Sequence, residues 1–158
     1  MTRQTLDEQL WAQRVPMLRL AMSILRNPHN AEDAVSAAIV QAYRKADGLR
    51  SEDRFKPWVM RITANCCYDL LRGEKRERSF QPEETYALFS LPEDSLFEQV
   101  MELPMEFSQV LILYYYENFS TLEIAQALRI APPTVRMRLT RGRRLLRRIL
   151  EEADDEIL

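Results

Sequence analysis

Apolar side chains recur at intervals of three and four residues along most of this 158-residue chain. The clearest runs lie at Leu6, Leu10, Leu18, Met22 and Leu25 and within residues 35–43, 58–70, 96–111 and 122–146. Because an α-helix completes a turn every 3.6 residues, this spacing predicts amphipathic helices. No segment alternates apolar and polar residues as a half-buried strand does, although residues 111–116, LILYYY, would suit a strand in isolation. We therefore expect an all-α fold.

Proline and asparagine residues divide the first part of this pattern. Pro16 has no amide hydrogen and clashes with the preceding turn, so it is expected to kink the first helix or to start a new one. Residues 27–30, NPHN, are expected to form a turn, with Asn30 capping the second helix. Glu32 and Asp33 would then lie in the first turn of that helix, where its dipole favours negative charge.

Composition further along the chain indicates two helical domains joined by a linker. A polar loop is expected over residues 48–56, with a third helix from near Pro57. Two prolines and several acidic residues make 79–94 a poor helix and a natural boundary. We therefore expect a first domain over 1–78, an acidic linker over 79–94, a second domain over 95–150 and an acidic tail over 151–158.

Charge is strongly segregated, although the whole chain has a formal net charge of only -2. Residues 79–128 hold nine acidic and no basic side chains, and residues 129–150 hold eight arginines and no acid. A segment with so much uncompensated positive charge is typical of one that binds an anionic partner such as a phosphate backbone. The alternative is a solvated helix face whose arginines pair with the acidic tail.

Several classes of function are excluded by composition. Two adjacent cysteines, Cys66 and Cys67, cannot form a disulfide framework, and a single histidine, His29, makes a zinc site improbable. There is no apolar signal core and no apolar run near the ~20 residues that span a bilayer. No arrangement of nucleophile, base and acid suggests catalysis. We expect a cytoplasmic, non-enzymatic protein without cofactor or metal.

Residues 118–148, NFSTLEIAQALRIAPPTVRMRLTRGRRLLRR, form the most informative segment. Ser120 and Glu123 have the spacing of a capping box that opens a short helix over about 120–129. A turn near 130–131 is followed by Pro132 and Pro133, which would open a second helix. Its inward positions are Val135, Leu139 and Leu146, and its outward positions are Arg136, Met137, Arg138, Thr140, Arg141, Arg143 and Arg144. This layout is typical of a helix-turn-helix, whose second helix enters the DNA major groove.

The segment from LPMEFSQV to RRLLRRIL resembles region four of the extracytoplasmic-function sigma factors of bacterial RNA polymerase. The N-terminal half, NPHNAEDAVSAAIVQAYRKADGLRSEDRFKPWVMRITANCCYDLLRGEKRER, resembles region two of the same family. The two matches occur in the expected order, with the expected linker between them. The resemblance implies a two-domain alternative sigma factor that binds core RNA polymerase, recognises the −35 and −10 promoter elements and promotes DNA melting for a stress- or signal-responsive set of genes.

The resemblance also implies roles for individual residues. The polymerase-binding candidates on the second helix are Asp33, Ser36, Gln41 and Arg44. The candidates at the −10 element, where an unstacked base would be captured, are Leu49, Phe55, Arg61, Asn65, Arg72 and Arg76. The candidates at the −35 element are Thr134, Arg136, Met137, Arg138, Thr140, Arg141 and Arg144.

Two further expectations follow from the family. The acidic linker would thread toward the RNA path of the polymerase, and an anti-sigma protein would hold the free chain, in some cases at the membrane and otherwise near the nucleoid. The sequence departs from the family pattern at Arg129, where the turn often carries glycine, so the turn is expected to close without its usual left-handed residue.

Two other classes of protein remain as alternatives. A response regulator with a helix-turn-helix output domain would need alternating strands and a phosphoacceptor aspartate in its N-terminal half, and neither is visible. A sigma-like protein that only sequesters an anti-sigma protein would not need the eight arginines at 129–148. Both alternatives are therefore weaker than a sigma factor.

Overall fold

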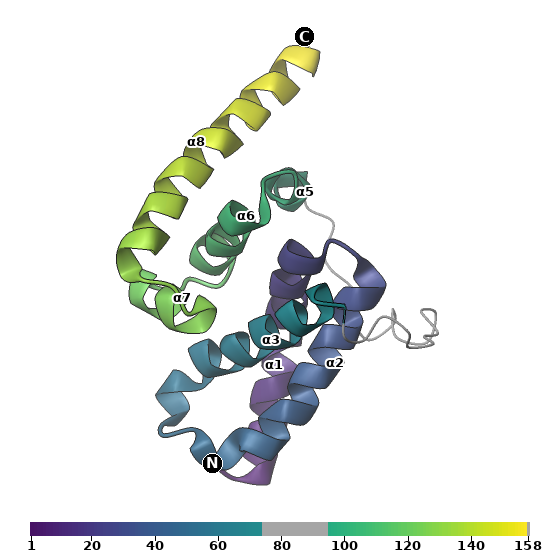
Figure 1. Cartoon of the computed structure of the whole chain (residues 1–158), viewed down its shortest axis with the longest axis vertical. Helices are drawn as coiled ribbons and strands as arrows, with labels where there is room; N and C mark the ends of the chain where they lie inside the picture. Colours follow the sequence, from purple (N-terminus) through teal and green to yellow (C-terminus); the bar gives the residue numbers. More distant parts are fainter. Residues whose placement is uncertain (74–94, 158) are drawn as a thin grey trace.

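The computed structural model describes residues 1–73 and 95–157, with side chains as far as residue 154. In these ranges the regular structure is entirely helical, which confirms the all-α expectation, and residues 111–116 are helical too (Figure 1). The elements are α1 (Arg3–Leu25), α2 (Pro28–Lys45), η1 (Ala46–Gly48), η2 (Glu52–Arg54), α3 (Phe55–Leu71), α5 (Ser95–Met101), α6 (Met105–Leu111), the π-helical segment η3 (Ile112–Tyr116), α7 (Thr121–Leu128) and α8 (Pro132–Ile157).

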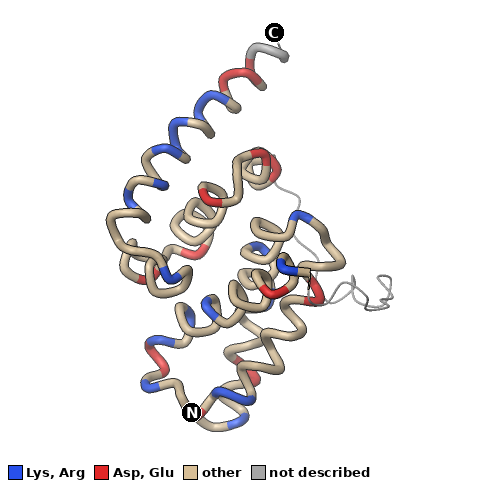
Figure 2. Tube along the Cα trace, in the orientation of Figure 1, with Lys and Arg blue, Asp and Glu red and all other residues tan. Residues whose placement is uncertain are grey.

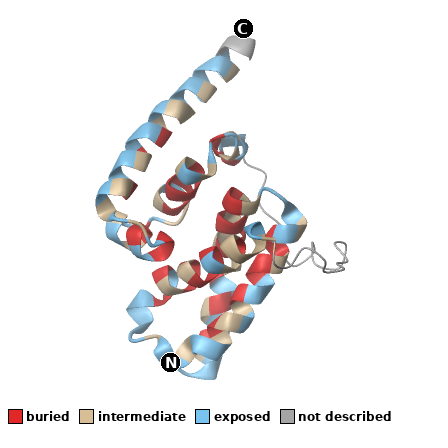
Figure 3. Cartoon of the chain, viewed as in Figure 1, coloured by how far each residue is buried: buried red, intermediate tan, exposed pale blue. Residues whose placement is uncertain are grey.

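Helices α1, α2 and α3 pack against one another around an apolar core (Figure 3). The largest fully buried side chains in this bundle include Met17, Leu20, Val35, Phe55 and Met60. Pro16 lies inside α1, which runs as one helix, so it does not start a new helix. The loop between α2 and α3 contains the short helices η1 and η2 and leads directly into α3 at Phe55, two residues before the expected start.

The N-terminus of α2 differs from the expectation. Residues 28–30 belong to the helix, and its cap is Asn27, whose Oδ1 accepts a hydrogen bond from the Asn30 N–H at 3.0 Å. Pro28 takes the first helical position, where its missing N–H has no cost. The prediction that Asn30 caps α2 was therefore wrong by one turn. The prediction that acidic residues lie in the first turn of α2 was also wrong, because that turn contains none. Glu32 is instead buried, with 1% of its surface exposed.

Helices α5 to α8 form the second group, in which α6 and α7 pack against α8. Gly142 marks a close crossing, because a Cβ placed there would lie 3.2 Å from Leu111 Cδ1 and 3.3 Å from Phe107 Cβ. The C-terminal part of α8 extends beyond the rest of the molecule (Figure 1).

The two groups of helices contact each other directly. α7 packs on α3, and α6 and η3 pack on α1. The contact includes an ion pair in which Arg19 Nε lies 2.8 Å from Glu117 Oε2. The contact between the two groups of helices therefore joins parts of the chain that are far apart in the sequence.

Candidate nucleic-acid interface

The helix-turn-helix begins with the predicted capping box. Ser120 Oγ accepts a hydrogen bond from the Glu123 N–H at 3.1 Å, and Glu123 Oε1 accepts one from the Ser120 N–H at 2.8 Å. These reciprocal bonds satisfy two backbone donors at the start of α7, a helix of only eight residues. The predicted start of this helix is confirmed.

The turn between α7 and α8 closes through Arg129. This residue has φ 57° and ψ 48°, in the left-handed region, and its N–H bonds to the Ala125 carbonyl. The expectation that the turn would close without a left-handed residue was wrong: arginine adopts the conformation that glycine usually supplies. Pro132 then starts α8, as predicted.

One face of α8 is exposed and basic (Figure 2). Val135 and Leu139 face the core, with 0% and 3% of their surfaces exposed. The exposed members of the predicted −35 set are Arg136, Met137, Thr140, Arg141 and Arg144. These five form the available recognition surface, which we call the α8 face.

Three other side chains on α8 are less exposed to solvent than their helical spacing predicts. Thr134, Arg138 and Arg143 are half-buried. The charge of Arg138 acts on Tyr68 of α3, partly opposing the rise in the Tyr68 pKa that burial causes. Arg138 is therefore less exposed than the arginines of the α8 face.

Arg143 is held by two tyrosines. Its Nε donates to Tyr115 Oη at 2.5 Å, and its guanidinium lies 5.4 and 5.5 Å from the ring centroids of Tyr114 and Tyr115. A cation over aromatic faces is attracted by the ring quadrupoles and so is held in place. This arginine therefore braces α8 against η3, although the helical spacing grouped it with the outward arginines.

A cavity of about 320 Å³ lies where the loop after α2 meets the start of α3. It is lined by Gly48, Leu49, Arg50, Arg54, Pro57, Trp58 and Arg61, together with Gln126 of α7. Three guanidinium groups and one indole ring around a cavity suit a nucleobase with its flanking phosphates, since the ring stacks and the cations attract. We call this the base cavity.

The predicted −10 residues are distributed unevenly around the base cavity. Leu49 and Arg61 line it, whereas Phe55 does not. Phe55 is 1% exposed, and its ring centroid lies 5.7 Å from that of Trp58, so it supports the wall from within the core. Asn65 is exposed one turn further along α3. Arg72 is exposed and pairs with Asp69, and Arg76 lies outside the described residues.

Of the eight residues that line the base cavity, only Leu49 and Arg61 were among the −10 candidates. Arg50 and Arg54 lie in the polar loop, whose cations were a usable signal. Trp58 belongs to the apolar pattern of the expected third helix, but it is half-buried and lines the cavity. Gln126 is far in the sequence from the other residues that line the cavity, and nothing in the sequence around it indicates that it lies there.

The predicted polymerase-binding residues lie along α2. Ser36 and Arg44 are exposed, and Asp33 and Gln41 are half-buried. Val40 has 48% of its surface exposed, which adds an apolar side chain to this helix. A single exposed apolar residue is normal on a protein surface, so Val40 does not by itself mark an interface.

The two cysteines differ in burial. Cys66 is half-buried and Cys67 is buried. Burial, with a smaller contribution from Cys66, raises the pKa of the Cys67 thiol.

Within residues 1–73 and 95–157, no three His, Cys, Asp or Glu side chains form a group that could hold a metal ion. None of the helices described there is long and apolar enough to cross a membrane.

These features define a class of protein: a two-part helical DNA-binding protein with a helix-turn-helix in its C-terminal half. The model of sigma-70 region 2 matches residues 11–77, and the model of sigma-70 region 4 matches residues 93–146. The chain belongs to the extracytoplasmic-function sigma factors of bacterial RNA polymerase. It is therefore a transcription initiation factor that acts with core polymerase at promoters, and not an enzyme.

Two curated relatives show the extent of the similarity. The chain is 30% identical over 141 residues to the RNA polymerase sigma factor SigV of Bacillus subtilis, covering 86% of this chain and 85% of the relative. It is 29% identical over 154 residues to the ECF RNA polymerase sigma factor SigW of the same organism, covering 85% of this chain and 82% of the relative.

Two solved structures share the fold. One is the sigma factor RpoE of Bartonella quintana in complex with the anti-sigma factor NepR, with a TM-score of 0.70 and 24% identity over 92% of this chain and 96% of that one. The other is CnrH in complex with the cytosolic domain of CnrY, with a TM-score of 0.69 and 22% identity over 96% of this chain and 90% of that one.

Proposed function

We propose that three separate surfaces of this sigma factor divide the work of promoter recognition. The α8 face binds the −35 element, the base cavity captures an unstacked base of the −10 element, and α2 binds core polymerase. The observation that carries this proposal is the base cavity, because its three arginines and one tryptophan meet within the matched region two.

The −35 assignment is supported by the exposure of the α8 face. Arg136 and Arg141 can each place two donors on a guanine edge or contact a phosphate, while Thr140 and Met137 offer smaller contacts. Thr140 Oγ1 donates to the Arg136 carbonyl at 3.0 Å, which leaves its methyl group and lone pairs for the DNA.

The −10 assignment requires that a base leaves the stack, which costs on the order of a few kcal/mol. Trp58 offers an aromatic face for the base, and Arg50, Arg54 and Arg61 offer charge for its neighbouring phosphates. Asn65 is exposed one turn beyond Arg61 on the same helix, and we assign to it a contact with the strand that leads to the cavity.

The polymerase assignment places Ser36, Val40 and Arg44 at the centre of an interface, with Asp33 and Gln41 at its edges. We also propose that an anti-sigma protein covers the free chain, since the solved structure of RpoE named above contains one. The chain would then work in the cytoplasm near the nucleoid, or be held at the membrane through that partner, and its target genes would respond to a stress or signal.

A three-variant experiment tests the division of work. Core polymerase is reconstituted with the wild type, Ser36→Arg, Asn65→Ala or Arg141→Ala, and a promoter selected by sequencing the DNA that the wild-type holoenzyme binds serves as template. Ser36→Arg should reduce polymerase binding, Arg141→Ala should reduce closed-complex affinity, and Asn65→Ala should reduce DNA melting without loss of polymerase binding.

Gln4→Ala, at an exposed position near the start of α1, is the matched control for Asn65→Ala. Polymerase binding is followed by gel filtration, affinity by filter retention and melting by permanganate reactivity of unpaired thymines. If Asn65→Ala and Gln4→Ala melt the promoter equally well, Asn65 has no role at the −10 element. If all three variants lose polymerase binding alike, the surfaces are not separate.

A further inference from the structure

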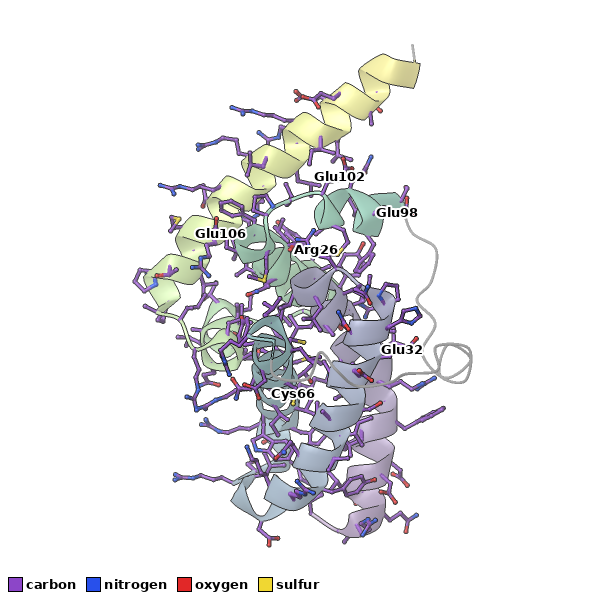
Figure 4. All side chains as sticks on the ribbon, turned by 45° about the vertical axis from the view of Figure 1, so that its right-hand side comes forward. Arg26, Glu32, Cys66, Glu98, Glu102 and Glu106 are labelled. Carbon is purple, nitrogen blue, oxygen red and sulfur yellow. The ribbon has the colours of Figure 1, made fainter. Side chains whose placement is uncertain are left out.

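The end of α8 stands clear of the other helices (Figure 1 and Figure 4). Among the described side chains of α8, Ile149 is the last that packs against the core. Beyond it the helix still carries apolar side chains, because Leu150 has 36% of its surface exposed and Ala153 is half-buried. Scattered apolar residues are normal on a surface, so the charges around them decide what this end of the helix fits.

Two opposite charges flank Leu150 on the same side of α8. Arg147 precedes it by three residues and Asp154 follows it by four, and residues at these spacings are neighbours on a helix. Both charged side chains are exposed. Ala153 follows Leu150 by three residues, so it borders the same side. We call Arg147, Leu150, Ala153 and Asp154 the end patch.

The charges of the end patch are not paired within the chain. Arg147 and Asp154 are seven residues apart, which is about two turns and about 10 Å along the helix axis. Among the side chains that the structure describes, no ion pair involves α8. The sequence left open that the arginines of this helix pair with the acidic tail, and that pairing is absent from the same set of side chains.

The last turn of α8 is also an unfavourable place for acidic residues. It contains Asp154 and no basic residue. The free carbonyl groups at the end of a helix carry partial negative charge, so cations are favoured there and carboxylates are not. A cation supplied by another molecule would therefore be stabilised at the end patch.

A second copy of α8, laid antiparallel on the end patch, supplies that cation. In a symmetric antiparallel pair, a two-fold axis passes between the helices, and residues equally far from the axis lie level with each other. With the axis between Leu150 and Glu151, Arg147 of each copy lies level with Asp154 of the other, and the two Leu150 side chains meet at the centre. A parallel pair would instead bring two Arg147 side chains together, and two Asp154 side chains.

We propose that the free chain self-associates through the end patch, as an antiparallel pair in which Arg147 of each copy binds Asp154 of the other. The overlap is short, so the pair belongs to the weak, transient class that buries less than about 1,200 Å². In this register the second α8 ends at Ile157, level with Arg144 of the first, and most of the α8 face stays open. The pair therefore does not rest on the function proposed above.

Sedimentation velocity of the full-length chain tests the self-association. Concentrations extend to about 1 mM, because a weak pair dissociates at micromolar concentration and above. The wild type should show an equilibrium between monomer and dimer, and added salt should shift it toward monomer, because the paired charges are exposed. A wild type that stays monomeric at every concentration overturns the proposal.

Charge reversal tests the antiparallel contact. Arg147→Asp and Asp154→Arg each place two like-charged contacts in a symmetric pair, so each should weaken self-association by about tenfold or more. An equimolar mixture of the two variants restores both contacts in the mixed dimer and should associate about as strongly as the wild type. No effect within one helix can produce this recovery, because the restored charges lie on different chains.

Arg148→Asp is the matched control. Arg148 is exposed, and it precedes Leu150 by two residues, which places it about 160° around the helix from Leu150. Its reversal makes the same change in net charge and should leave self-association unchanged within about twofold. Circular dichroism confirms that every variant keeps its helix content.

Two further results would overturn the proposal. If Arg148→Asp weakens the dimer as much as Arg147→Asp does, net charge and not the end patch controls self-association. If the mixture of Arg147→Asp and Asp154→Arg associates no better than either variant alone, the two residues do not meet across the pair.

Discussion

Two arginines on α8, two residues apart, should respond very differently to the same substitution. Arg141 is exposed on the α8 face, whereas Arg143 donates to Tyr115 Oη and stacks on two tyrosine rings. Arg141→Ala should cost about 1–3 kcal/mol at the selected promoter, a loss of roughly 5- to 150-fold in affinity. Arg143→Ala should change the affinity by less than about threefold, since its guanidinium is already engaged within the protein.

Salt dependence shows how Arg141 acts. Affinity of the holoenzyme for the promoter is measured by fluorescence anisotropy at several salt concentrations. If Arg141 contacts a phosphate, its removal lowers the slope of log K against log salt by about 0.9 and weakens all sequences alike. If it reads a base, the slope changes little and discrimination at one base pair is lost. Equal losses for Arg141→Ala and Arg143→Ala would refute the exposed α8 face as the recognition surface.

Three other substitutions or modifications test local features of the fold. Ser120→Ala removes the side-chain half of the capping box and should cost about 1 kcal/mol, lowering Tm by about 2–4 °C in thermal unfolding; an unchanged Tm would contradict a capping role. Gly142→Leu forces a side chain against Leu111, already 3.2 Å from a Cβ at that position, and should lower the free energy of unfolding in urea by about 1–3 kcal/mol or more; a stabilised protein would show that the crossing can widen. Because the pKa of Cys67 is raised and the residue is buried, iodoacetamide at about pH 8 should modify Cys66 first, and mass spectrometry should find Cys67 modified only after unfolding.

Features that depend on neighbouring residues could be predicted from the sequence. The capping box at Ser120 and Glu123 and the start of α8 at Pro132 follow from local backbone chemistry, and the structure confirms both. The cap of α2 was also available, because Asn27 followed by Pro28 fits a cap and a first helical residue. The prediction of a turn over residues 27–30 was wrong because Pro28 is the first residue of α2 and not part of a turn.

Features that depend on distant residues could not be predicted. Arg143 has helical spacing that faces outward, and only its contact with Tyr115, 28 residues earlier, removes it from the recognition surface. Gln126 has no local feature that relates it to Trp58, yet both line the base cavity. Phe55 was a −10 candidate from the family resemblance, but it is buried and supports Trp58 from within the core.

The near-neutral total charge and the proposed affinity for DNA are compatible because charge is separated in space. Exposed acidic residues lie on α5, on α6 and in the turn between them, at Glu98, Glu106 and Glu102, while the α8 face is basic (Figures 2 and 4). Interactions between exposed charges fade over a Debye length of about 8 Å at physiological salt. A phosphate in contact with the α8 face therefore experiences the adjacent arginines most strongly, so the local placement of charge decides binding.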